Sequence, residues 1–291
     1  MKSFFDRERP TLSFEIFPPK GEGRLSGIYD TVDALTSLDP DLISVTYGAG
    51  GTSRENTAEI ASKIQNSYST PAVAHLTCIG STREQMRETL TDLRGRGIEN
   101  ILALRGDLTE KDSLSDFRYA SDLIRFIKEE GFDFKIFAGC YPEKHPEALT
   151  PQQDIANLKY KTECGVDVLI SQLFFDNDLF YRFRDNAVKA GINVPIEAGI
   201  MPITSGKQIE RIVSLCGATL PPVVQNFIKA YGHNSMAIKE AGIALATAQI
   251  ADLLANGVDG IHLYTMNKPD VAEKITDNLR GIFYSLRVKR G

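Results

Sequence analysis

The segment TLSFEIF, residues Thr11–Phe17, shows the pattern that decides the fold of this 291-residue chain. It is short, apolar and rich in Phe and Ile, as buried strands are, and a single carboxyl group, Glu15, interrupts it. Segments of the same kind recur along the whole chain. The others are Leu42–Tyr47, Ala72–Cys78, Asn100–Gly106, Phe134–Tyr141, Val168–Phe175, Pro195–Met201 and Gly260–Met266.

An amphipathic helical stretch lies between most of these segments, and alternation of strands and helices predicts a parallel sheet. Eight such units in one chain of this length predict a (β/α)8 barrel, which we expect to form one domain over residues 1–291. The long interval before the last strand has room for extra helices, at Ser205–Cys216, Pro221–Tyr231 and Ser235–Asn256. Active sites of such barrels form where the strands end, so polar residues there are the candidates for chemistry.

The composition excludes several classes of protein. The net charge is −5 and no basic stripe is visible, which argues against nucleic-acid binding. No window is apolar enough for a membrane span, and the N-terminal MKSFFDRERP does not resemble a signal peptide. The 4 cysteines are too far apart in sequence for a C-x-x-C site, so we expect no structural metal and a cytoplasmic location.

Glu15 is the strongest catalytic candidate. A carboxyl group on an apolar strand must be paired or protonated, because burying an isolated charge is costly. A buried carboxyl group also keeps its proton more readily than an exposed one, which suits a general acid near neutral pH. The alternative is a structural ion pair with an inward-facing Lys or Arg.

Polar residues follow several other strands. Arg105, Gly106 and Asp107 end the fourth, where Gly106 allows a ligand to approach the backbone and Asp107 can accept a hydrogen bond from a heterocycle. A surface pair of Arg105 with Asp107 explains these two residues equally well. Gln172 interrupts the sixth strand, and either binds an amide-like ring or bridges neighbouring strands.

The remaining candidates suit a ring-shaped ligand. Tyr141 and His145 are suited to stacking and polar contact, whereas His75 has the pattern of a hydrogen-bonded core residue. Glu143, His145 and Glu147 are spaced by prolines and lack a second histidine nearby, which argues against a metal site. No Ser-His-Asp set and no lysine at a strand end is visible, so we expect an organic cofactor to supply the difficult chemistry.

The strings SFEIFPPK, SVTYGAGG, AHLTC, LRGD, YASDL, AGCYPEKHPEA, SQLFFD and YTMN, in this order, resemble the methylenetetrahydrofolate reductase family. The resemblance runs from about Thr11 to Lys268 and is closest to the short bacterial type. It implies a cytoplasmic flavoenzyme with non-covalent FAD. The implied reaction converts 5,10-methylenetetrahydrofolate to 5-methyltetrahydrofolate with NADH or NADPH, for one-carbon metabolism and methionine supply. We also expect a homo-oligomer.

The resemblance also implies residue roles. Glu15 would be the general acid, Asp107 would lie between flavin and pterin, and the substrate contacts would be Gln172, Gln208 and Lys268. The FAD contacts it implies are Thr46, Tyr47, Ala49, His75, Arg105, Gly106, Asp107, Ala120, Tyr141, His145, Ala148, Asp154, Asn157 and Lys161.

Three positions depart from the family pattern. Tyr160 stands where a basic residue near FAD is expected, Ile212 where some members have an aromatic residue, and Lys268 where an arginine is expected. Two other readings remain open: a flavin barrel of the proline dehydrogenase kind, and a folate-binding barrel without flavin. A non-catalytic scaffold is disfavoured, because Glu15 and Gln172 would then be buried polar groups without a use.

Overall fold

The computed structural model describes residues 9–19, 25–47, 54–68, 70–107 and 115–288. Within these ranges, parallel strands form a closed barrel in the order of the sequence, with β1 paired to both β2 and β8. The predicted (β/α)8 barrel is therefore confirmed. The strands are β1 (Thr11–Ile16), β2 (Leu42–Val45), β3 (Ala72–Thr77), β4 (Asn100–Leu104), β5 (Lys135–Cys140), β6 (Val168–Ser171), β7 (Ile196–Ile200) and β8 (Gly260–Tyr264).

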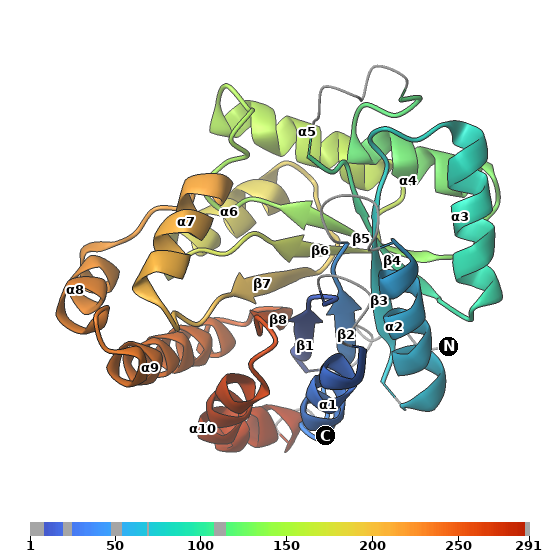
Figure 1. The fold of residues 1–291 in the computed structure, drawn as a ribbon. Helices are drawn as coiled ribbons and strands as arrows, with labels where there is room; N and C mark the ends of the chain where they lie inside the picture. Colours follow the sequence, from blue (N-terminus) through green and yellow to red (C-terminus); the bar gives the residue numbers. More distant parts are fainter. Residues whose placement is uncertain (1–8, 20–24, 48–53, 69, 108–114, 289–291) are drawn as a thin grey trace.

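Helices surround the barrel, as Figure 1 shows. Several begin at the signals that the sequence contains: Thr82 forms a capping box at the start of α3, and Thr150 caps α5. In the described residues no helix has the length and apolarity that crossing a membrane requires. The helices are α1 (Leu25–Thr36), α2 (Arg54–Ser67), α3 (Arg83–Gly95), α4 (Ala120–Glu129), α5 (Pro151–Glu163), α6 (Asn177–Lys189), α7 (Gly206–Cys216), α8 (Pro222–Tyr231), α9 (Ser235–Ala255) and α10 (Pro269–Val288).

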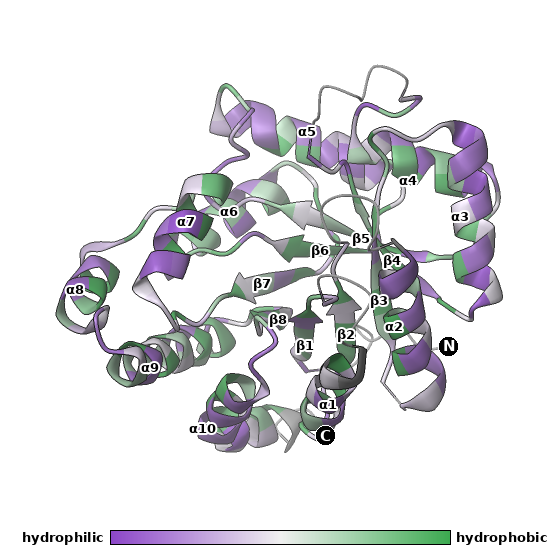
Figure 2. Ribbon diagram, viewed as in Figure 1, coloured by the Kyte–Doolittle hydropathy of each residue, from purple (hydrophilic) through white to green (hydrophobic). Residues whose placement is uncertain are grey.

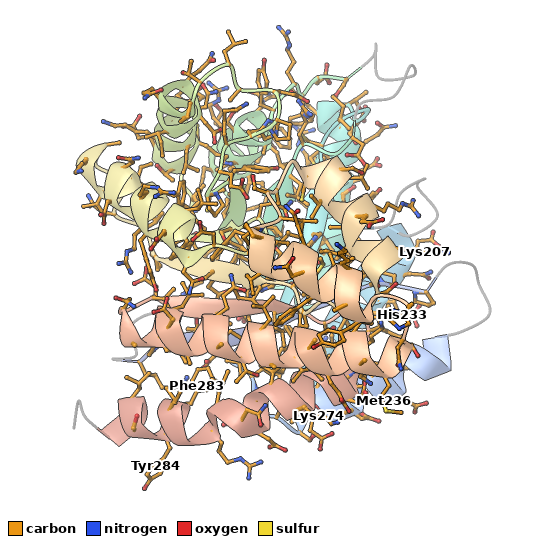
Figure 3. The ribbon with its side chains drawn as sticks, turned by 90° about the vertical axis from the view of Figure 1, so that its left-hand side faces the viewer. Lys207, His233, Met236, Lys274, Phe283 and Tyr284 are labelled. Carbon is orange, nitrogen blue, oxygen red and sulfur yellow. The ribbon has the colours of Figure 1, made fainter. Side chains whose placement is uncertain are left out.

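The extra helices α7, α8 and α9 lie where the sequence predicted them. Together they cover one end of the barrel, because an apolar cluster joins them to the segments that follow β6 and β7. Figure 3 shows this side of the molecule, with α9 and α10 lying side by side and Lys207 and His233 near the ends of the extra helices. The members of the cluster are Leu173, Phe175, Met201, Ile203, Ile209, Ala218, Val224 and Ile238.

The strands are shorter than the predicted segments at their carboxyl ends. Residues 172–175, for example, were predicted to continue β6, but β6 ends at Ser171. The chain then turns, so that Phe174 packs into the main core and Phe175 into the cluster under α7. An apolar composition does not distinguish these residues from the strand, since both are buried.

Two apolar layers position the strands. The larger one lies between the sheet and the helices, and a smaller one fills the barrel next to β2–β6 with Leu42, Val73, Leu102, Phe137, Val168 and Ile170. Figure 2 shows the resulting pattern, with apolar strands and helices that are polar on their outer faces. The interior next to β1, β7 and β8 is different, since Thr11, Ser13, Glu15, Glu197 and His262 are buried there.

Candidate active site

Glu15 lies inside the barrel near the carboxyl end of β1. Successive side chains of a strand point to opposite faces, so Thr11, Ser13 and Glu15 face the interior while Leu12, Phe14 and Ile16 pack against helices. Glu15 is only 6% exposed. The segment after β8 holds its backbone, because the Thr265 hydroxyl donates a hydrogen bond to the Glu15 carbonyl oxygen at 2.6 Å.

The same segment fixes the end of β1 with a second residue. The Asn267 side chain accepts from the Phe17 N–H at 2.8 Å and donates to the Phe17 carbonyl at 2.8 Å. Met266 and Asn267 both adopt left-handed backbone angles, with φ of 53° and 55°, which non-glycine residues rarely do. This strained turn brings the asparagine across the end of β1 and so contributes to the placement of Glu15.

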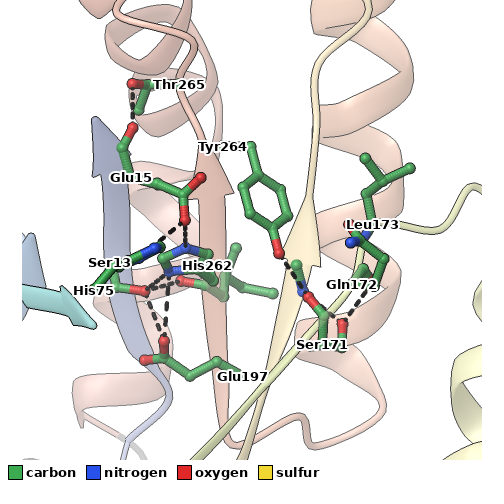
Figure 4. Close-up of polar contacts among 12 residues, drawn as sticks. Ser13, Glu15, His75, Ser171, Gln172, Leu173, Glu197, His262, Tyr264 and Thr265 are labelled. Atoms are coloured by element: carbon green, nitrogen blue, oxygen red, sulfur yellow. Dashed lines mark hydrogen bonds and ion pairs between the residues drawn. The ribbon is translucent and has the colours of Figure 1, made fainter. Parts of the chain in front are cut away.

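Two imidazoles face the Glu15 carboxyl group (Figure 4). Nε2 of His75 lies 3.4 Å and Nε2 of His262 lies 3.5 Å from Oε2 of Glu15. The alternative expectation, an ion pair with Lys or Arg, is therefore not what the described residues form. Burial lowers the pKa of His75 to about 4, so its ring is neutral at neutral pH. Glu15 thus faces two imidazoles, of which His75 is neutral, rather than the permanent cation of a Lys or Arg.

Asp107 and Arg105 lie where β4 ends. Asp107 is exposed, and Gly106 before it has φ of +91°, with Thr77 and Ile79 so close that a side chain there would crowd them. Arg105 donates two hydrogen bonds to Glu147, at 2.7 and 2.6 Å. The alternative pair of Arg105 with Asp107 is therefore wrong, because the Arg105 guanidinium binds Glu147 instead.

The residues after β5 are tied to α5. The rings of Tyr141 and His145 meet edge to face, 4.6 Å apart, and the His145 N–H donates to Asp154 at 3.0 Å. From the same helix, Nζ of Lys161 donates to the Gly139 carbonyl at 2.5 Å. Burial lowers the pKa of Lys161, while the nearby Cys140 and Asp154 act in the opposite direction. Four of the predicted cofactor residues therefore lie together at this edge.

The carboxylates after β5 are occupied by other contacts. Glu143 accepts from the Thr219 N–H at 2.8 Å and from its hydroxyl at 2.5 Å, and Glu147 binds Arg105. Across the part of the chain that the structure describes, no group of three or more His, Cys, Asp or Glu side chains could hold a metal ion.

The predicted substrate residues lie on the other side of the mouth. Gln172 accepts the Leu173 N–H on its amide oxygen at 2.9 Å, so its amide nitrogen is the part that a ligand can bind. Nζ of Lys268 donates to the Thr204 hydroxyl at 2.6 Å. Burial, followed by the charge of Lys239, lowers the pKa of Lys268. Gln208 is half-buried near the start of α7, the helix that follows Thr204.

The other predicted cofactor residues also follow strand ends. Thr46 is buried after β2, Tyr47 is half-buried beside it, and Ala148 is buried between β5 and α5. Ala120 begins α4, and Asn157 is exposed on α5. Ala49 lies outside the described residues.

Two of the departures can be located. Tyr160 is 48% exposed on α5. It lies close enough to Arg125 on α4 to raise the pKa of that guanidinium, so Arg125 is a cation beside this position. Ile212 packs against the apolar cluster under α7 and α8. An aliphatic side chain at this position serves the packing of α7.

The family model described as methylenetetrahydrofolate reductase matches residues 1–280. The chain belongs to this family. It is 37% identical to 5,10-methylenetetrahydrofolate reductase of Pectobacterium carotovorum subsp. carotovorum over 93% of this chain and 90% of the other. It is 36% identical to the Escherichia coli (strain K12) reductase over 92% and 90% of the two chains.

A plant relative and a solved structure extend the comparison. Methylenetetrahydrofolate reductase (NADH) 1 of Arabidopsis thaliana is 35% identical over 100% of this chain, which spans 51% of the plant protein. An uncharacterized protein from Clostridium thermocellum that binds two copies of 5-methyl-5,6,7,8-tetrahydrofolic acid has a TM-score of 0.67 at 14% identity, covering 97% and 98% of the two chains. At that identity the likeness concerns the fold alone.

Proposed function

We propose that this chain reduces 5,10-methylenetetrahydrofolate to 5-methyltetrahydrofolate with bound FAD and with NADH or NADPH as electron donor. Membership of the methylenetetrahydrofolate reductase family supports the folate reduction. The observation that carries the proposal is Glu15, a buried carboxyl group near the carboxyl end of a barrel strand, facing two imidazoles. We further propose that the protein is a cytoplasmic homo-oligomer.

The residues after β4 and β5 suit FAD. Gly139 lies on the same face of β5 as Phe137, which packs inside the barrel, and a Cβ placed on Gly139 would meet no atom within 4 Å. Arg105 and Lys161 provide positive charge for phosphate groups, and Tyr141 and His145 provide aromatic surface. FAD bound there would supply the hydride-transfer chemistry that the side chains of this chain lack.

The chain's own residues then supply binding and the proton. Glu15 protonates the folate ring nitrogen that must leave, and its position on a rigid strand keeps the carboxyl group aimed into the mouth. Gln172, Gln208 and Lys268 bind the folate or the nicotinamide. Because these residues line one open mouth, the two substrates use the site in turn.

The flavin proposal is tested by adding FAD to the purified protein. We expect a yellow protein after removal of free cofactor, with an absorption spectrum typical of a bound flavin that is released on denaturation. If the protein is instead a folate-binding barrel without flavin, it should bind no FAD and stay colourless. A protein that stays colourless after incubation with excess FAD would contradict the proposal.

Replacing Asp107 with Asn should preserve FAD binding but slow folate reduction by about 10–100-fold, equivalent to about 1.4–2.7 kcal/mol of transition-state stabilisation. The reason is that Asp107 is exposed at the end of β4, where its charge can orient the pterin and influence the flavin. Asp133→Asn, an exposed aspartate before β5 at the opposite end of the barrel, is the control. Equal folate kinetics in both variants would contradict a role for Asp107.

A further inference from the structure

A second carboxyl group, Glu197 on β7, is buried below Glu15 and has no part in the proposed reaction. It is 0% exposed. The Thr11 hydroxyl donates to its Oε1 at 2.6 Å. The Ser13 hydroxyl donates to its Oε2 at 2.7 Å (Figure 4). Both oxygens of this buried carboxyl group therefore act as hydrogen-bond acceptors for hydroxyl groups of β1.

Ser13 connects Glu197 to His262. Its Oγ lies 2.7 Å from Oε2 of Glu197 and 2.7 Å from Nδ1 of His262, but a hydroxyl group has one proton to donate. If Ser13 donates to Glu197, its oxygen must accept from His262, so the proton of that ring lies on Nδ1. Nε2 of a neutral His262 is then an acceptor, and it points at Oε2 of Glu15 from 3.5 Å.

The opposite arrangement has the opposite effect on Glu15. If Ser13 donates to His262, Nδ1 accepts and Nε2 carries the proton. An N–H group facing Glu15 stabilises its ionised form, which cannot act as an acid. The direction of one hydrogen bond, from Ser13 to Glu197 or to His262, therefore determines whether the surroundings favour a proton on Glu15.

The other titratable groups around this network are His75, Tyr264 and Asp41. His75 is neutral, and Tyr264 is neutral because burial above all raises its pKa well above the usual value. Asp41 forms a two-point ion pair with Arg9, at 2.7 and 2.9 Å. The pKa of Glu197 is raised, because burial outweighs the effects of His262 and of the Thr11 and Ser13 hydroxyls, which act to lower it.

We propose that Glu197 is a positioning residue for the general acid. By accepting the Ser13 hydrogen bond, Glu197 keeps the proton of His262 on Nδ1, and the bare Nε2 of His262 keeps the proton of Glu15 in place. That proton then passes to the leaving nitrogen of the folate, which leaves Glu15 ionised. The use of this proton rests on the proposed function, but the hydrogen-bond arrangement does not.

Nitrogen-15 NMR of histidine-labelled protein tests the arrangement directly, because protonated and bare ring nitrogens have different chemical shifts. The chain has only 4 histidines, and His262→Gln assigns the signal. At neutral pH we expect the wild-type His262 proton on Nδ1. Glu197→Val removes this acceptor and leaves Nδ1 of His262 at 2.7 Å and the Ile261 carbonyl at 3.4 Å. Ser13 should then donate to the nearer Nδ1, and the proton should move to Nε2.

Thr11→Val is the matched control, since it removes a hydrogen bond to the other oxygen of Glu197 but leaves Ser13 in place. We expect its His262 proton to stay on Nδ1. A wild-type proton on Nε2 overturns the proposal without any variant of Glu197. The same tautomer in wild type and Glu197→Val also overturns it.

Kinetics test the consequence for Glu15. In Glu197→Val, oxidation of the reduced protein by 5,10-methylenetetrahydrofolate should be about tenfold slower at neutral pH, with its pH dependence shifted about one unit lower. Bleaching by NADH should be unchanged, and Thr11→Val should behave as wild type in both steps. A tautomer change without this slower step overturns the role in catalysis. If wild type shows no folate reaction, the proposed function fails, and the NMR result still decides the hydrogen-bond arrangement.

Discussion

Replacing Glu15 with Gln should slow the reaction of reduced protein with 5,10-methylenetetrahydrofolate by about 10²–10⁴-fold, the usual effect of removing a general acid. Gln has nearly the same size and can still bond to the imidazoles of His75 and His262, but it has no proton to give at neutral pH. Bleaching of bound flavin by NADH or NADPH requires no such proton. It should proceed at nearly the wild-type rate.

Stopped-flow absorbance under anaerobic conditions measures the two steps separately. Glu143→Gln is a suitable control, because this carboxylate lies at the rim and binds Thr219 rather than the interior of the barrel. If Glu15→Gln slows both steps equally, or neither, then Glu15 has a structural role and the proton has another source.

Replacing Gly199 with Ala should destabilise the protein by about 1–3 kcal/mol, the usual cost of forcing extra atoms into a packed interior. A Cβ on Gly199 would lie 2.1 Å from the Ser171 carbonyl oxygen and 2.8 Å from the ring of Tyr264. The Tyr264 hydroxyl donates to that same carbonyl at 2.8 Å. The methyl group would displace the Ser171 carbonyl and the Tyr264 ring. Because Ser171 ends β6, the displacement would also move Gln172, which follows it.

Gly139→Ala is the control for this prediction, since it adds the same methyl group on β5 with no atom within 4 Å. Urea unfolding of the cofactor-free proteins should show a lower midpoint for Gly199→Ala and a nearly unchanged one for Gly139→Ala. Equal stability of the two variants would mean that the close contact at Gly199 relaxes without cost.

The fold could be predicted from sequence because its signals are local. The apolar segments such as Thr11–Phe17 and the helix caps at Thr82 and Thr150 each depend on a few neighbouring residues, and their alternation leaves few topologies. The carboxyl ends of the strands were less predictable. Residues that leave the sheet there remain buried, so Phe174 and Phe175 have the composition of a strand.

The surroundings of Glu15 could not be predicted in the same way. His262 and Ser13 are far apart in sequence and meet only because β8 pairs with β1 when the barrel closes. A usable signal was present at Glu197, which interrupts the apolar segment Pro195–Met201 as Glu15 interrupts its own. The partner of Arg105 was missed for the same reason, since Glu147 reaches it from the segment after β5.

The most direct test of the proposed function is the reaction of FAD-loaded, photoreduced protein with 5,10-methylenetetrahydrofolate in the absence of oxygen and nicotinamide. We predict that the flavin absorbance returns and that 5-methyltetrahydrofolate forms in an amount equal to the flavin reoxidised. A flavin that stays reduced, or that is reoxidised without formation of 5-methyltetrahydrofolate, would contradict the proposed function.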